Sequence, residues 1–226
     1  MANTTKNRIS RPVIEREISL KTPCAQRVFN RSYNEVSRNL YSLGVVSRVL
    51  ASEEVADEVD AIVQQRLKEM EEALQAERER LEALREENGV DQLPTYTEPK
   101  AIPAGVSSPT TFQYLSLIQS LDELVVRLDS LWLTDVFTSK QKLRAEYLWQ
   151  KRMIKLANQL RDLYNRSKAA ARRQGKEVLE DASGKATEAE DKEEPVEKAA
   201  NGEDHSEQPT SAPEEHPEPA QAAAAR

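Results

Sequence analysis

The stretch "YLSLIQSLDELVVRLDSLWL", residues 114–133, is the most apolar part of this 226-residue chain, and its pattern decides the fold. Drawn as an α-helix, it carries a second apolar stripe of Leu115, Val126 and Leu133. A helix that is apolar on two sides must be covered on two sides, so it belongs in the middle of a helical bundle. The main apolar arc consists of Tyr114, Leu117, Ile118, Leu121, Leu124, Val125, Leu128, Leu131 and Trp132.

The segment after this central helix predicts a last helix with two different faces. Thr138-x-x-Gln141 is a capping box, and it opens a helix that we expect to end near Arg173. Tyr147 and Ile154 lie near its basic face, which is therefore not wholly solvated. The basic face consists of Lys140, Arg144, Lys151 and Lys155, and the opposite, apolar face of Trp149, Met153, Leu156, Leu160 and Tyr164.

The segment before the central helix predicts one long charged helix over residues 53–87. Ser52 is a suitable N-cap, and Asn88-Gly89 ends the helix. Its narrow apolar seam is typical of a coiled coil or of an arm of a long antiparallel helical hairpin. The seam can pack within the chain or against the helix of a partner. That partner can be a second copy of the chain, which would give a homodimer. The seam residues are Val63, Leu67, Met70, Leu74, Leu81 and Leu84.

The N-terminal part predicts a strand followed by a helix. Residues 1–12 are polar and expected to be flexible. Residues 13–22 alternate, with Ile14, Ile18 and Leu20 on the inner face of a short strand. A helix then begins at Pro23 and ends with Gly44 as its C-cap. The four prolines of residues 89–109 predict an extended connection.

Charge is distributed unevenly along the chain. Residues 1–48 hold nine lysines and arginines against three acids, a net of +6, and residues 99–176 hold fourteen against six, a net of +8. Residues 49–98 hold five against fifteen, a net of −10. Residues 177–226 hold four against fifteen, a net of −11, and this composition predicts that the tail from residue 174 onward is disordered.

Several classes of function are excluded by residues that are missing. Both histidines, His205 and His216, lie in the tail, so the body can form neither a Ser-His-Asp site nor a usual zinc site. No glycine-rich phosphate loop is present. We therefore expect no catalytic residue, no metal, no cofactor and no small-molecule substrate. One cysteine and no membrane-spanning apolar run favour a cytoplasmic protein that does not enter a membrane.

The candidate functional residues are basic. Arg27, Arg31 and Arg38 form a stripe on the first helix, opposite its apolar side chains, and either contact phosphates or pair with the acidic helix 53–87. The face from Lys140 to Lys155 is either a nucleic-acid surface or merely solvated. Few aromatic residues accompany these cations, which disfavours single-stranded nucleic acid.

The order strand, helix, turn, helix in residues 13–52 is also that of a ribbon-helix-helix module, in which two chains pair their strands and read the DNA major groove. Ser19 and Lys21 would then lie nearest the bases. Glu15 and Glu17 share that outward face, which is a poor electrostatic fit to DNA.

Five stretches together resemble the AcaB-like transcriptional regulator family. They are "ISLKTPCAQRVFNRS", "RNLYSLGVVSR", "PTYTEPKAIPAGVSSP", "YLSLIQSLDELVVRLDSLWLTDVFTSKQ" and "YLWQKRMIKLANQLRDL". These proteins are encoded on integrating conjugative elements and conjugative plasmids. The resemblance covers residues 13–166 and implies a non-enzymatic, double-stranded-DNA-binding regulator with a ribbon-helix-helix-like N-terminal part.

The expected architecture is therefore mainly α. It has a helical body over residues 13–173, including the two-helix region 110–173, between a flexible N-terminus and a disordered acidic tail. The rival function is a helical coiled-coil scaffold of a conjugation or partition complex, which would use the seam of residues 63–84 and bind no DNA.

Overall fold

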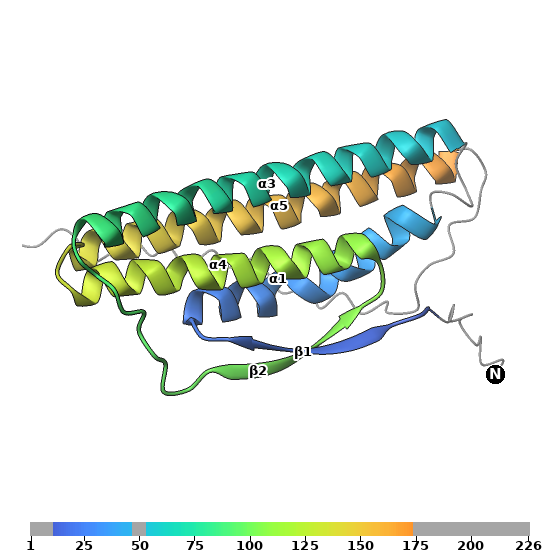
Figure 1. The fold of residues 1–226 in the computed structure, drawn as a ribbon. Coiled ribbons are helices and arrows are strands. Elements are labelled where there is room, and N and C mark those ends of the chain that lie inside the picture. Colours follow the sequence, from blue (N-terminus) through green and yellow to red (C-terminus); the bar gives the residue numbers. More distant parts are fainter. Residues whose placement is uncertain (1–10, 47–52, 174–226) are drawn as a thin grey trace, which may run out of the picture. The chain divides into compact units, whose positions relative to one another are not determined.

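The computed structural model describes residues 11–46 and 53–173, all within one structural unit, Met1–Gly184. The predicted disordered tail and nearly all of the predicted flexible N-terminus lie outside the described residues. The predicted mainly α fold with an N-terminal strand is confirmed (Figure 1). Its elements in chain order are β1 (Ile14–Leu20), α1 (Pro23–Tyr41), the π-helical turn η1 (Ser42–Val46), α3 (Glu53–Glu87), β2 (Lys100–Val106), α4 (Pro109–Leu133) and α5 (Ser139–Arg173).

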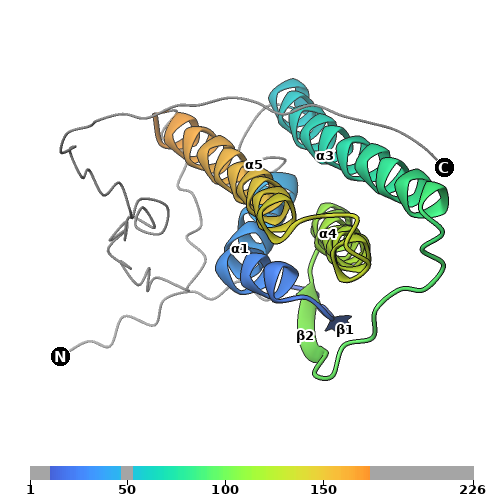
Figure 2. The same cartoon turned by 90° about the vertical axis from the view of Figure 1, so that its left-hand side faces the viewer.

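Helix α4 is the centre of the bundle, as its two apolar sides predict. It packs against α1, α3 and α5, and Figure 2 shows it between α1 and α3. Tyr114, Leu121 and Leu128 have no exposed surface. Only the last turn departs from the expectation, because Trp132 and Leu133 are 40% and 62% exposed where the helix leaves the core.

The apolar seam of α3 packs within the chain. Val63, Leu67, Leu74 and Leu81 are buried in the same core as α4, while Met70 and Leu84 pack against its edge. The seam is thus covered by the chain's own helices. Its direct neighbour α4 runs parallel to it, because β2 first carries the chain back to the end where α3 began (Figure 1). The long antiparallel hairpin, predicted with helix 53–87 as an arm, is instead formed by α4 and α5, joined by residues 134–138.

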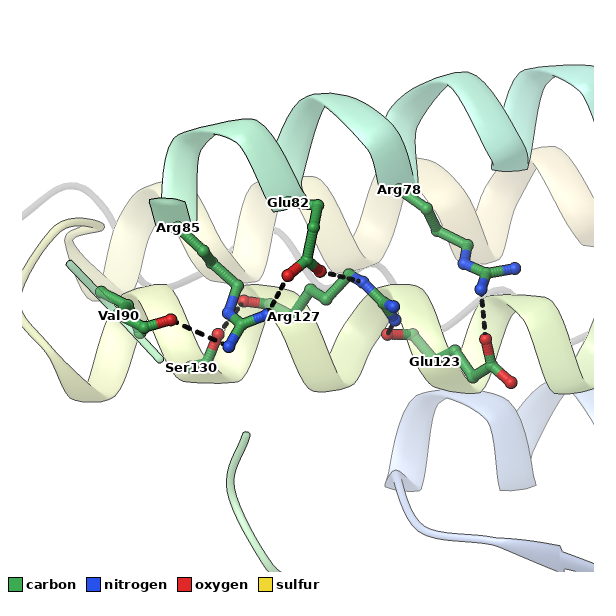
Figure 3. A network of polar contacts seen from close by, with 7 residues as sticks. All are labelled: Arg78, Glu82, Arg85, Val90, Glu123, Arg127 and Ser130. Carbon is green, nitrogen blue, oxygen red and sulfur yellow. Dashed lines mark hydrogen bonds and ion pairs between the residues drawn. The ribbon is translucent and has the colours of Figure 1, made fainter. Parts of the chain in front are cut away.

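A row of charged side chains fixes the register of α3 on α4. Figure 3 shows Glu82 between Arg85 of its own helix and Arg127 of α4, whose Nε donates to Glu82 at 2.9 Å. Arg78 pairs with Glu123 one turn earlier on both helices. The two cross-helix pairs advance in the same direction along α3 and α4, which is the signature of a parallel pair.

The predicted extended connection over residues 89–109 contains a strand that the sequence pattern does not predict: β2 pairs antiparallel with β1 from Ile14↔Val106 to Leu20↔Lys100. Pro103 and Gly105 hide this strand in the sequence, because both residues are unfavourable inside strands. A two-stranded sheet tolerates them, since each strand has an outer edge.

The predicted inner face of β1 is only partly correct. Ile18 and Leu20 are buried at 6% and 0% exposure, but Ile14 is 69% exposed at the outer end of the sheet. Arg16, which interrupts the apolar pattern, covers the Phe112 ring with its guanidinium 4.7 Å from the ring centroid. The strand therefore uses an arginine stem where the simple alternation requires an apolar residue.

The two predicted helix ends have different outcomes. Gly89 takes a positive φ of 66° directly after α3, and Val90 N–H donates to the Arg85 carbonyl at 2.9 Å, which is a Schellman cap. Gly44 was expected to cap the first helix in the same way. It instead lies inside η1 without a positive φ, because the chain continues from α1 as a π-helical turn.

Candidate nucleic-acid interface

Helices α1 and α5 lie side by side and run parallel (Figures 1 and 2). The Cys24 thiol is 3.9 Å from the Glu146 carbonyl oxygen near the start of α1. Further along both helices, the Arg161 guanidinium is 4.0 Å from the Glu35 carboxylate. The middle of α1 therefore lies level with residues near 150–155 of α5.

The arginine stripe of α1 faces away from the core. Arg27 and Arg31 are exposed, and Arg38 is half-buried. The Arg27 and Arg38 Nε groups donate at 3.2 Å to main-chain carbonyls one turn earlier in α1. The opposite side of the helix is apolar and buried, as expected, with Phe29, Tyr33, Val36, Leu40 and Leu43 in the core.

The acidic helix is not the partner of these exposed arginines. In the part of the chain that the structure describes, no ion pair joins Arg27 or Arg31 to α3. Helix α3 packs on α4, which lies between it and α1 (Figure 2). The α3 cations Lys68, Arg78, Arg80 and Arg85 pair with acids of α3 or α4 instead.

Helix α5 carries a row of solvent-exposed cations. Between residues 139 and 170 it exposes seven cations and a single acid, Asp162. The four predicted residues are among them. Of the three that the sequence prediction missed, Arg152 and Arg161 lie about 60° to either side of the predicted line, whereas Arg166 continues the line beyond Lys155. The net charge of +8 over residues 99–176 was the signal for additional cations. The exposed cations are Lys140, Arg144, Lys151, Arg152, Lys155, Arg161 and Arg166.

We call these seven residues, together with Arg27 and Arg31, the basic surface. The two helices that carry it are adjacent, so Arg27 and Arg31 of α1 and the line of cations from Lys140 to Lys155 on α5 form two neighbouring rows. Arg152 and Arg161 lie on opposite flanks of the α5 row. Helix α3, by contrast, exposes nine acids and only two cations between residues 54 and 87. The described bundle therefore segregates its charge: α1 and α5 are basic outside, and α3 is acidic.

The strand is a weaker candidate for contacting DNA. Ser19 and Lys21 are exposed as expected, but Glu15 and Glu17 are exposed on the same outer face. Their cross-strand neighbours on β2 are Gly105, Pro103 and Ala101, which offer no side-chain hydrogen bonds. The strand's partner also comes from the same chain, whereas the predicted ribbon-helix-helix arrangement pairs strands of two chains. Among the residues that the structure describes, no hydrogen bond or ion pair joins Ser19 to the basic surface.

The start of α1 is anchored by Asp122 of α4. Its carboxylate accepts hydrogen bonds from the Lys21 N–H at 3.0 Å, the Thr22 N–H at 2.8 Å and the Thr22 hydroxyl at 2.7 Å. Thr22 is the N-cap of α1 and accepts in turn from Ala25 N–H at 3.3 Å. A buried negative charge at a helix N-terminus is favourable, so Asp122 sets the position of the arginine stripe.

The start of α5 is fixed by a second polar cluster. The Lys142 ammonium is 2.9 Å from both the Asp129 and the Glu146 carboxylates, and the Tyr96 hydroxyl donates to Asp129. Burial alone would lower the pKa of Lys142, but its bonds to Glu146 and Asp129 outweigh burial and raise it. The first turns of both helices that carry the cations, α1 and α5, are thus held in place by buried or half-buried polar contacts.

The environment of Cys24, which is 1% exposed, is unsuited to a nucleophilic thiol. Burial, reinforced by the charge of Glu146, raises the pKa of its thiol to about 12, so it stays protonated near neutral pH. Among the described residues, no group of three His, Cys, Asp or Glu side chains is placed to hold a metal ion. Within the same residues, none of the helices combines the length and the hydropathy of a membrane span.

The fold and surface define a mainly helical protein with a small antiparallel sheet and segregated surface charge. No family model matches the chain, and no curated protein matches it. Among solved structures, it is similar to the crystal structure of selenomethionine-containing AcaB from uropathogenic E. coli. The two share 34% sequence identity with a TM-score of 0.73, over 78% of this chain and 94% of that chain. The chain belongs to the AcaB family.

Proposed function

We propose that this chain is a non-enzymatic DNA-binding regulator of transcription for a conjugative or integrating mobile element, acting in the bacterial cytoplasm. The observation that carries the proposal is the basic surface, nine exposed cations on two adjacent parallel helices with Asp162 as the one exposed acid among them. Membership of the AcaB family supports the regulatory role that the sequence resemblance implies.

Duplex DNA is the partner that this surface fits best. Its phosphates form two negatively charged rows, and cations that neutralise them release condensed counterions. The acids of α3, which would repel a duplex, lie on a different helix of the bundle. Segregated charge of this kind also steers a polyanion toward one side of a protein. Ser19 and Lys21 remain predicted contacts in addition to this surface.

The test is a salt titration of the full chain on a labelled duplex from the element's own promoter region, followed by fluorescence anisotropy. We expect log affinity to fall linearly with log salt, with a slope of about −0.9 for each phosphate contact. Replacing Arg27, Arg31, Lys151 and Lys155 together by Ala should make the slope shallower by about 3–4. Light scattering of the same complexes counts the copies on each duplex and so tests for a homodimer.

The control is Lys68→Ala with Arg80→Ala, which removes two exposed cations from α3. That variant should bind with the slope of the unmodified chain. If the unmodified chain fails to bind even at low salt, the proposal is wrong and the helical scaffold becomes the better explanation. The scaffold has less support now, because α3 uses its seam in the chain's own core.

A further inference from the structure

The basic surface contains apolar side chains that phosphate binding does not use. Ten large apolar side chains are exposed in the described residues, and five of them fall between residues 132 and 148. Two of these, Leu143 and Tyr147, lie one helical turn apart on α5 and are 60% and 61% exposed. Large exposed apolar residues gathered in one place commonly mark a contact site.

Leu143 and Tyr147 border the row of cations directly. At 100° per residue, Leu143, Tyr147, Lys140 and Lys151 fall within about 80° of one another around α5. The Lys151 ammonium lies 6.0 Å from the centroid of the Tyr147 ring. The same side of α5 meets α1, since both Glu146 and Arg161 contact that helix. The apolar pair therefore lies between the two rows of cations.

A row of charged phosphates provides no apolar surface against which a leucine side chain or a phenol ring could pack. A duplex, however, presents base edges and sugars between its two rows of phosphates, and the apolar base faces become accessible when a step is unstacked. DNA-binding proteins insert apolar side chains between base steps there, unstacking the step and kinking the duplex. A tyrosine ring adds stacking energy against any base.

We propose that Leu143 and Tyr147 contact the bases and unstack one base step while the basic surface holds the flanking phosphates. This inference rests on the proposed function and assigns base contacts to α5 in addition to those predicted for β1. A second copy of the chain is a poorer occupant of this face, because two copies meeting there would bring Lys140, Arg144 and Lys151 of both chains together. A polyanion with flat apolar bases matches both the charge and the apolar pair.

The experiment uses the full chain with duplexes in which 2-aminopurine replaces adenine at successive positions, together with end-labelled duplexes that report bending by energy transfer. The unmodified chain should raise the 2-aminopurine fluorescence at one step and shorten the end-to-end distance. Leu143→Ala with Tyr147→Ala should abolish both signals and weaken binding about 5- to 100-fold. The salt slope should stay unchanged, because neither side chain neutralises a phosphate.

Two variants serve as controls. Val55→Ala removes an apolar side chain of similar exposure, 48%, from the acidic helix α3, which carries none of the basic surface, and should change neither signal. Tyr147→Phe keeps the ring and should retain unstacking. Circular dichroism of each variant checks folding, which the high exposure of the substituted side chains should spare.

The outcomes separate this inference from the proposed function. If the unmodified chain does not bind at low salt, both are wrong. If it binds with the expected slope but the double variant unstacks and bends the duplex equally well, only the inference is overturned. It is also overturned if light scattering shows that the double variant loses a dimer yet keeps the DNA signals, since the pair is then a protein interface.

Discussion

Asp122 is the residue on which the start of α1 depends most. Its carboxylate accepts three hydrogen bonds from residues 100 positions earlier in the chain, and it is 4% exposed. Without it, the Thr22 N–H and hydroxyl would be left in a buried place without an acceptor. Unsatisfied buried donors cost far more than the net gain of an average hydrogen bond.

Asp122→Asn should therefore lower the free energy of unfolding by about 2 kcal/mol, because the amide nitrogen cannot accept from a donor. Urea unfolding followed by circular dichroism measures the change. Asp162→Asn is the matched control, since Asp162 is exposed on α5, and it should change stability by less than about 0.5 kcal/mol. Equal effects of the two variants would contradict the anchoring role of Asp122.

Glu82 makes the stability of the α3–α4 pair dependent on pH. Burial alone would raise the pKa of its carboxyl, but the hydrogen bonds and charges of Arg127 and Arg85 outweigh burial and lower the pKa below its ordinary value. A lowered folded-state pKa means that the stabilisation is present above the ordinary pKa of about 4.5. It is lost as the pH falls below that value through the folded-state pKa.

Glu82→Gln should cost about 1–2 kcal/mol at pH 7, because Arg85, 4% exposed, loses its charge partner. The difference from the unmodified chain should shrink at pH 3, where Glu82 itself becomes protonated. Urea unfolding at the two pH values checks this. Glu86→Gln, an exposed position on the same helix, is the control, and a pH-independent penalty at Glu82 would refute the account.

At the scale of elements, the end of α3 tests the role of a single backbone conformation. Gly89 adopts φ 66°, which an alanine takes only with strain, so Gly89→Ala should destabilise the chain by about 1 kcal/mol. Gly44→Ala is the matched control: a Cβ there meets nothing within 4 Å, and alanine is the better helix former. Thermal unfolding should separate the two variants in opposite directions, and identical shifts would refute the cap.

The elements also show what the sequence can and cannot predict. The helices and the central place of α4 follow from periodicity, since a helix with two apolar stripes has to be buried on both. The sequence does not predict strand β2, because Pro103 and Gly105 are unfavourable inside a strand and are accommodated here only by pairing with the single strand β1. The parallel direction of α3 and α4 depends on β2, which carries the chain back along the bundle, so the sequence could not predict that direction either.

The candidate site was predictable in part for the same reason. The four cations from Lys140 to Lys155 share one helical line, and that line is visible in the sequence. Arg166 continues this line, whereas Arg152 and Arg161 lie on its two flanks, and only Arg161 is placed beside α1, where it pairs with Glu35. The adjacency of the two basic helices is a tertiary fact that no local pattern contains.

At the scale of the whole molecule, the acidic tail is expected to compete with DNA. Residues 177–226 carry a net charge of −11, while residues 1–176 carry +4. A chain ending at Lys176 should therefore bind duplexes of unrelated sequence severalfold more tightly, with the largest gain at low salt. Anisotropy titrations of the two chains measure this, and an unchanged affinity would exclude the competition.

The pairing of β1 with β2 has a consequence for how the chain is made. β1 begins at Ile14, but its partner ends at Val106, and the Asp122 anchor for α1 is translated later still. Contacts this distant in sequence form slowly, since a long loop must close before any of them is made. During synthesis the arginine-bearing helix has no place to dock until α4 has left the ribosome. Incomplete chains therefore cannot assemble the basic surface, and premature termination yields fragments that lack it.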